Sequence, residues 1–222
     1  MLERCHQQTV LKPGDWTVSR LLVYPDAVGD PRDQLLSLLV RHSFQYSAEP
    51  VFTLASGRKS HYYINCKKTT FMPEAMPLLG RLFFERIKAA EQRGGEPIDA
   101  VGGLTLGADP IAYATAYHSA LEGAPIQAFS VRKEPKAHGS QKWVEGFEEA
   151  GARVAIIEDV VTTGASTLKA LEGALHAGFR IAIVLALVDR REGGREALKK
   201  KGYDLEAIYT TEDLMRVSRM SA

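Results

Sequence analysis

The strongest constraint on the fold is a regular alternation of apolar and amphipathic segments along the second half of the chain. Strands are predicted at five apolar runs: 98–103, 126–132, 153–159, 181–189 and 205–210. Helical patterns are found at 109–118, 166–177 and 194–201, and a terminal helix follows the last strand. Apolar strands that alternate with helices form parallel sheets buried on both faces. The sequence therefore predicts an α/β fold with an open, mainly parallel sheet flanked by helices.

The first third of the chain is less regular. Residues 1–31 are punctuated by proline and glycine and are expected to form an irregular extension, while residues 32–222 are expected to form one domain. Within this domain the patterns predict three elements before the alternation begins: a helix over 33–44, a hairpin of the strand-like runs 51–54 and 62–65, and a helix from Pro73 to about Ala90.

Composition excludes several classes of function. The chain has 222 residues and a formal net charge of +1, which argues against bulk binding of nucleic acid or of an anionic membrane. Cys5 and Cys66 are its two cysteines and form no CxxC pair, so neither a disulfide framework nor a zinc site is expected. The sequence contains no run of about 18 apolar residues, so no transmembrane helix is expected. Its start also lacks a signal-peptide pattern. We expect a cytoplasmic protein with no membrane or nucleic-acid partner.

The chemistry concentrates in the stretch VAIIEDVVTTGAS, residues 154–166. An apolar strand ends there in Glu158 and Asp159, although carboxylates are costly to desolvate. The TTGAS turn bends at Gly164 and offers backbone N–H groups at a helix N-terminus, a geometry that binds phosphate. Acids would repel a bare phosphate, whereas they can accept hydrogen bonds from the hydroxyls of a sugar. The stretch predicts a sugar-phosphate site; the alternative is an ordinary N-cap made by Thr or Ser.

Two further segments leave strands of the same predicted sheet. The segment RKEPKAHGSQKWVEG (132–146) is strongly basic, and its Pro, Gly and Ser residues favour a mobile loop. Such a loop can neutralise a departing diphosphate; the alternative is a solvated surface run. The segment VDRREGG (188–194) places Arg190 at the end of a buried strand. A guanidinium can bind a carboxylate through two parallel hydrogen bonds, and the alternative for this arginine is a surface ion pair.

These segments together resemble a known family. The apolar strand followed by Glu-Asp and Thr-Thr-Gly-x-Ser resembles the phosphoribosyl diphosphate (PRPP) motif of type I phosphoribosyltransferases. The pattern Arg-Lys-Glu-x-Lys-x-His-Gly at 132–139 resembles the catalytic loop of the orotate phosphoribosyltransferases. The block FTLASGRKSHYYIN (52–65) resembles the N-terminal block of that family, and GGLTLGADPIA (102–112) resembles its diphosphate-side loop. The resemblance covers roughly residues 35–215, with the motifs in the family's order.

The resemblance implies a fold and an activity. The expected fold is that of type I phosphoribosyltransferases, with a small N-terminal hood-like subdomain over about 32–70 and a mobile catalytic loop. The expected reaction transfers the phosphoribosyl group of PRPP to orotate, giving orotidine 5′-monophosphate and diphosphate on the route to UMP. Mg²⁺ is the expected cofactor, held mainly by substrate oxygens rather than by a protein cage. A homodimer is also implied, in which the catalytic loop closes over the active site of the neighbouring subunit.

The resemblance also assigns roles to residues of this chain. Two acids are expected to hold the ribose 2- and 3-hydroxyls, the turn to hold the 5-phosphate, and the loop to neutralise the diphosphate. The implied PRPP-binding residues are Arg132, Lys133, Lys136, His138, Glu158, Asp159, Val160, Val161, Thr162, Thr163, Gly164, Ala165 and Ser166. The implied catalytic residues are Lys136, His138 and Asp159, and the implied orotate-binding residues are Thr162 and Arg190.

Two positions depart from the family pattern, and two rival functions stay open. Ala55 and Gly107 stand where many members have lysines that touch PRPP, which leaves more of its neutralisation to the loop. A purine phosphoribosyltransferase would share the motif at 154–166, but the block at 52–65 and the basic loop favour orotate. A non-catalytic PRPP-binding regulator would be expected to lack that loop and to carry a basic recognition helix, which residues 1–46 do not show.

Overall fold

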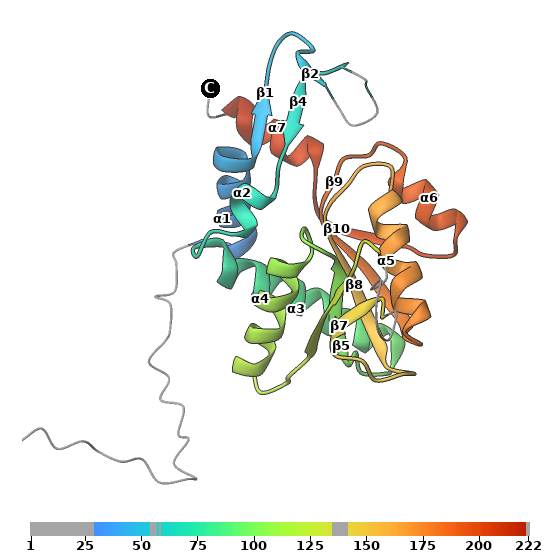
Figure 1. Ribbon diagram of the computed structural model, residues 1–222. Helices are drawn as coiled ribbons and strands as arrows, with labels where there is room; N and C mark the ends of the chain where they lie inside the picture. The colour runs from blue at the N-terminus through green and yellow to red at the C-terminus, as the bar shows by residue number, and fades with distance from the viewer. Residues whose placement is uncertain (1–28, 54–56, 58, 135–141, 221–222) are drawn as a thin grey trace, which may run out of the picture.

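The centre of the molecule is a six-stranded sheet with the order β10-β9-β8-β5-β6-β7. The computed structural model describes residues 29–53, 57, 59–134 and 142–220 (Figure 1). The strands of the sheet are β5 (Ala100–Leu104), β6 (Gln127–Val131), β7 (Val144–Gly146), β8 (Arg153–Val161), β9 (Arg180–Asp189) and β10 (Leu205–Thr210). Neighbouring strands are parallel except for β6 and β7. The predicted mainly parallel sheet is confirmed, and β7 is an antiparallel edge strand within the run predicted as a loop.

Helices cover both faces of this sheet (Figure 1). They are α3 (Ala75–Gly94), α4 (Asp109–Leu121), α5 (Ala165–His176), α6 (Gly194–Lys200) and α7 (Thr211–Met220). Alternate residues of β8 belong to separate cores: Ala155 and Ile157 pack in a core with α3, α4 and α7, whereas Val154 and Ile156 pack in one with α5 and α6. Successive strand residues point to opposite faces. The strand is therefore buried on both faces, as its unbroken apolar sequence predicts.

The N-terminal helix begins slightly earlier than the apolar pattern predicts. Helix α1 (Pro31–Leu38) starts after Asp30, whose carboxylate accepts a hydrogen bond from the Arg32 backbone N–H at 2.9 Å. Pro31 stands at the first helical position, where its missing N–H costs nothing. The helix continues into one π-helical turn, η1 (Leu39–Ser43). Helix α1 thus begins within one residue of the predicted boundary at about residue 31, and residues 1–28 lie outside the described part of the chain.

Two antiparallel ladders replace the predicted hairpin of 51–54 with 62–65. The paired strands are β1 (Phe44–Tyr46) with β4 (Tyr62–Ile64), and β2 (Phe52–Thr53) with β3 (Lys59–Ser60). The predicted pairing was wrong because β1 pairs with the second run, although its first residue was assigned to the preceding helix and the other two to no element. Phe44 lies opposite Ile64 with both side chains buried, and the Phe44 ring stacks on Tyr62 at 6.1 Å between centroids. Apolar burial thus selects this register.

A short helix that the sequence patterns do not predict, α2 (Lys67–Thr70), follows β4. Its start is fixed in the interior, because Cys66 is fully buried and the Thr69 hydroxyl lies 2.6 Å from the Ser43 hydroxyl of η1. Burial raises the pKa of the Cys66 thiol, which is therefore an apolar packing group at neutral pH. Within the described residues, no helix combines the length and apolar character needed to cross a bilayer.

Tyr209 on β10 ties the N-terminal helix to the sheet and yields a test of this packing. Its hydroxyl donates a hydrogen bond to the Arg32 carbonyl at 2.6 Å, and the Arg32 guanidinium lies 5.1 Å from its ring centroid. We expect Tyr209→Phe to lower the free energy of unfolding by about 1 kcal/mol and the melting temperature by roughly 2–4 °C. Tyr203→Phe is the matched control, since the structure gives its hydroxyl no partner among the described residues. Equal melting temperatures for both variants would contradict this anchoring role.

Candidate functional site

The carboxyl end of β8 carries two adjacent buried acids. Glu158 and Asp159 are 5% and 3% exposed. Glu158 turns towards α5, where the Thr167 hydroxyl donates a hydrogen bond to its Oε2 at 3.3 Å. Asp159 turns towards α2, where its Oδ2 lies 3.2 Å from Lys67 Nζ. One acid therefore has a neutral partner and the other a cation, so the two carboxyl groups are not equivalent.

Desolvation sets the protonation of the first acid. Burial, and after it the charge of neighbouring Asp159, raises the pKa of Glu158 to about 8. In the free protein this carboxyl group therefore keeps its proton at pH 7. A neutral carboxyl group donates through one oxygen and accepts through the other. The pair can thus meet a ligand that carries neighbouring hydroxyl groups, each of which is both donor and acceptor.

The turn after β8 leaves the start of α5 open. Gly164 takes the left-handed conformation with φ 83°, and no described side chain caps the first amides of the helix. The alternative of an ordinary N-cap is therefore not what the structure shows. A Cβ on Gly164 would lie 3.2 Å from Gly194 at the start of α6, so the two backbones approach closely. Uncapped N–H groups at a helix N-terminus are suited to bind an anion.

The other residues of this motif occupy distinct surroundings. Thr162 is half-buried, whereas Thr163, Ala165 and Ser166 are exposed around the open start of α5. The side chain of Val161 is buried in the core on the α5 side, and Val160 packs against the opposite core. Both valines can therefore contact a ligand at this edge only through their backbone atoms.

Arg190 follows β9 and reaches the same edge from the next strand. Its side chain is almost fully buried, with the guanidinium 4.9 Å from the ring centroid of Tyr62 on β4. Its Nη2 lies 2.8 Å from Glu192 Oε1, a contact without hydrogen-bond geometry, and its Nε has no hydrogen-bond partner in the described part of the chain. A buried arginine with unused donors is suited to bind a planar carboxylate. The alternative of a surface ion pair does not fit this burial.

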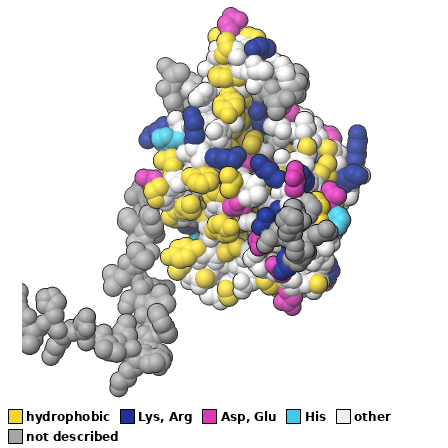
Figure 2. Space-filling view, in the orientation of Figure 1, with side chains coloured by type: hydrophobic (Ala, Val, Ile, Leu, Met, Phe, Trp, Pro, Cys, Tyr) yellow, Lys and Arg dark blue, Asp and Glu magenta, His cyan; other side chains and the backbone are white. Residues whose placement is uncertain are grey.

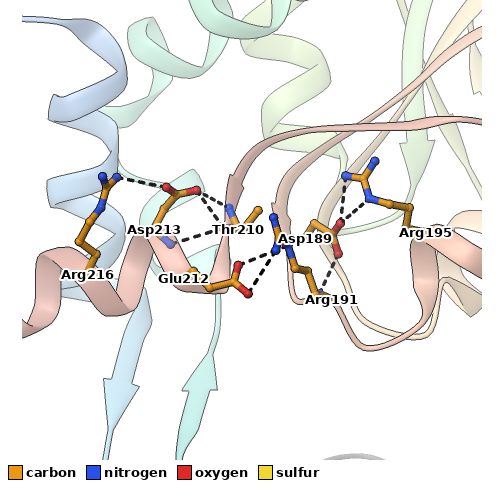
Figure 3. A network of polar contacts seen from close by, with 7 residues as sticks. All are labelled: Asp189, Arg191, Arg195, Thr210, Glu212, Asp213 and Arg216. Atoms are coloured by element: carbon orange, nitrogen blue, oxygen red, sulfur yellow. Dashed lines mark hydrogen bonds and ion pairs between the residues drawn. The ribbon is translucent and has the colours of Figure 1, made fainter.

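A polar network holds the backbone around this arginine (Figure 3). The fully buried carboxylate of Asp189 accepts the Arg191 backbone N–H at 2.8 Å and lies 3.1 Å from Arg195 Nη2. Arg191 has a left-handed φ of 54°, which costs a non-glycine residue about 1–2 kcal/mol. The Arg191 side chain also pairs with Glu212 of α7 at 3.3 Å. These contacts offset the strain and fix the turn that directs Arg190 inward.

The predicted basic loop is only partly described. Arg132 at the end of β6 places its Nε and Nη2 at 2.9 and 2.6 Å from Glu145 of β7, and Lys133 is exposed. Lys136 and His138 lie outside the described residues, so their predicted roles stay predictions. The structure therefore brings together the acids, the turn and Arg190, whereas Arg132 pairs within its own strand pair.

Three contacts at the site were missed by the sequence analysis. They involve Lys67, which pairs with Asp159, Tyr62, which covers Arg190, and Glu192, which accepts the Tyr62 hydroxyl at 3.4 Å. The sequence signal was weak in each case. Lys67 and Lys68 form a basic pair after a strand, and such pairs are usually solvated. A lysine's partner depends on folding across long sequence separations, which periodicity does not reveal.

A separate cavity of about 390 Å³ lies at the opposite edge of the sheet. It is lined by the beginnings of β8 and β9 and by the end of α3. The charged residues there are already paired, as Arg93 with Glu206 at 2.5 Å. Ligands of open parallel sheets bind beyond the carboxyl ends of the strands, so the acid-bearing edge is the candidate site.

Curated proteins resemble this chain over almost their full length. Orotate phosphoribosyltransferase of Aquifex aeolicus is 45% identical over 184 residues, which are 83% of this chain and 97% of that protein. The orotate phosphoribosyltransferase of Synechocystis is 40% identical over 206 residues, or 92% of this chain and 98% of that protein. No protein-family model matches the chain.

Solved structures agree with these relatives. Mycobacterium tuberculosis orotate phosphoribosyltransferase in complex with PRPP has a TM-score of 0.66 and 34% identity, covering 83% of this chain and 99% of that one. Adenine phosphoribosyltransferase from Leishmania donovani has a TM-score of 0.57 and 16% identity. That lower identity shows a shared fold alone, so the purine enzyme gives no support for purine specificity.

The raised pKa of Glu158 predicts a pH-dependent stability. The folded state binds this proton more tightly than the unfolded state, whose carboxyl titrates near 4.5. The associated stability is fully present below pH 4.5 and is lost as pH rises to about 8. We expect Glu158→Gln to remove this loss, so that the variant gains stability relative to the native protein between these pH values. Denaturant unfolding of the ligand-free protein at pH 5, 6.5 and 8 measures the difference.

Glu172→Gln is the control for this measurement, because Glu172 is an exposed acid on the same helix, α5. Its unfolding free energy is expected to follow the native protein at each pH. A constant difference between Glu158→Gln and the native protein across the range would contradict the burial of a protonated Glu158.

Proposed function

The chain belongs to the orotate phosphoribosyltransferase family and transfers the phosphoribosyl group of PRPP to orotate, and we propose which of its residues perform each part of that reaction. The products are orotidine 5′-monophosphate and diphosphate. The open start of α5, directly beyond two buried acids, is the observation that carries the assignment of residues. The 5-phosphate binds the amides of residues 163–166, and the ribose hydroxyls meet Glu158 and Asp159.

Orotate binds between Arg190 and the turn. The buried guanidinium of Arg190 has donors without hydrogen-bond partners in the described residues, and these can bind the orotate carboxylate. Tyr62 covers the guanidinium on one side and limits its rotation. Thr162 is half-buried at the end of β8 and provides a hydroxyl for the pyrimidine. Arg190 and Thr162 therefore orient the base towards the ribose.

Charge separation is the main demand of the chemistry. As the bond between C1 and the diphosphate oxygen breaks, positive charge develops on the ribose and negative charge on the leaving group. Arg132, Lys133 and Lys136 neutralise the diphosphate, and His138 donates a hydrogen bond or proton to its leaving oxygen. Orotate binds with its N1 deprotonated, and the lone pair of this nitrogen then forms the bond to C1. Asp159 and Glu158 hold the ribose so that C1 faces the base.

Mg²⁺ fits the donors at this edge as an ion held mainly by substrate. Among the described residues there is no group of three or more side chains that could hold a metal. The adjacent carboxyl groups of Glu158 and Asp159 offer oxygen atoms, the donors that Mg²⁺ prefers. When bound with PRPP, Mg²⁺ neutralises part of the charge on the leaving diphosphate. Asp159 and Glu158 would contact its shell of water and ribose oxygens.

We also propose a homodimer that shares the basic loop. Helix α4 exposes Tyr113, Tyr117 and Leu121, spaced four residues apart and each more than half exposed. Figure 2 shows hydrophobic side chains gathered on the face over α4. An apolar stripe of this kind on a helix is suited to bind a second copy. The family resemblance supports a loop that reaches the neighbouring site. A cytoplasmic location stays a prediction from composition.

The role of Asp159 can be tested by its charge. Asp159→Asn keeps the size of the side chain but removes the charge, so it weakens the contacts to the ribose hydroxyls. We expect turnover of orotate to fall at least about a hundredfold, the lower range for a positioned acid or base. Orotate consumption with PRPP and Mg²⁺ measures the rate. Glu149→Gln, at an exposed acid of the opposite edge, is the control. An unchanged rate in Asp159→Asn would show that the acid is structural.

Loop sharing can be tested by mixing two defective subunits. Lys136→Ala and Asp159→Asn homodimers should each be nearly inactive. If the loop acts across the dimer, random mixing makes about half of the dimers mixed, each with one intact site, so activity recovers to about a quarter of the native value. If each loop serves its own chain, every site keeps one defect. Activity at the parental background after verified subunit exchange would contradict the shared site.

A further inference from the structure

The packing of α2 against the core places Lys67 next to the two acids. The residue before it, Cys66, is fully buried, and Thr69 and Thr70 of the same helix are buried as well. The side chain of Lys67 is 47% exposed and ends 3.2 Å from Asp159 Oδ2. The neighbouring Lys68 is exposed. The fold therefore directs one lysine of this pair to the site.

On the side away from Lys67, the backbone at Gly107 lies against the Asp159 carboxylate. A Cβ on Gly107 would lie 2.3 Å from Asp159 Oδ1 and 2.8 Å from its Cγ. No side chain can therefore extend from position 107 while Asp159 keeps this position. The loop between β5 and α4 brings bare backbone against the acid, and the cation for this carboxylate comes from α2 instead.

The position of Lys67 also indicates which part of PRPP it can meet. Glu158 faces α5, where the open helix start receives the 5-phosphate, whereas Asp159 faces α2 and Gly107. Lys67 therefore lies on the other side of the acid pair from the 5-phosphate site. This is the side of the loop 105–108, which the resemblance assigns to the diphosphate.

Two other described cations of the site, Arg132 and Arg190, lie beside acids that do not bind the ribose. Arg132 pairs with Glu145, and Arg190 lies beside Glu192 beneath Tyr62. The partner of Lys67 is instead a ribose-binding group. A lysine ammonium has three donors, so it can hold Asp159 and a diphosphate oxygen together.

Resting on the proposed function of this edge, we propose that Lys67 is a PRPP-binding residue that contacts the diphosphate while it holds Asp159. It supplies a positive charge on the side where Gly107 carries no side chain. Lys67 also holds the Asp159 carboxylate in place before the substrate arrives, through the contact at 3.2 Å. The chain thus neutralises its substrate from α2 as well as from the basic loop.

Removing the charge of Lys67 tests this contact. We expect Lys67→Met to weaken the binding of PRPP about tenfold or more, the range for a lost charged hydrogen bond. The affinity for ribose 5-phosphate, which lacks the diphosphate, should fall by a smaller factor, since only the ordering of Asp159 changes for this ligand. Calorimetric titration of the full-length protein with each ligand and Mg²⁺, without orotate, measures both. Lys67→Gln is expected to behave as Lys67→Met, because it too lacks the charge.

The control variant is Lys68→Met, which should bind both ligands as the native protein does. Equal affinity of Lys67→Met and the native protein for PRPP would overturn the proposal. Equal losses for PRPP and ribose 5-phosphate would also overturn it, because Lys67 would then act only through Asp159. A separate variant tests the proposed function of the site independently of Lys67. Normal binding of ribose 5-phosphate by Gly164→Val would refute the phosphate site at the start of α5, whatever the result for Lys67→Met.

Discussion

The burial of two neighbouring carboxyl groups is the constraint on which the site depends. An unpaired buried charge is too costly for a folded protein, so each acid needs its own solution. Glu158 keeps its proton and accepts a hydrogen bond from Thr167. Asp159 has Lys67 as a partner at 3.2 Å. The result is one neutral and one cation-paired carboxyl group side by side, an arrangement that suits the hydroxyls of a sugar.

Close backbone approaches place the rest of the site around this pair. Gly164 packs against Gly194, which joins the turn after β8 to the start of α6. Gly107 packs against Asp159, which joins the loop after β5 to the same edge. A side chain at any of these positions would separate segments that must touch. The three strand ends therefore converge because small residues allow it, and the buried Asp189 holds the turn that adds Arg190.

Sequence periodicity was sufficient to predict the central sheet but not to predict the N-terminal strands. The apolar runs of β5, β8 and β9 are long and unbroken, so burial on both faces could be predicted from them. The run 44–46 is short and only its first residue fell within a predicted element, and its pairing with 62–64 depends on the contact of Phe44 with Ile64. Two or three residues carry too little pattern to distinguish such registers. The same holds for the edge strand β7 and for α2.

The sequence by itself determined the parallel sheet, the glycine turn before α5 and the family, because each depends on residues that are close in the chain or on a regular apolar period. The tertiary structure alone decided the partners of the site residues. Lys67 reaches Asp159 across 92 positions, and Tyr62 reaches Glu192 across 130. Contacts of this kind follow from which faces the core buries, and a lysine or tyrosine in sequence carries no mark of the partner that packing will bring to it.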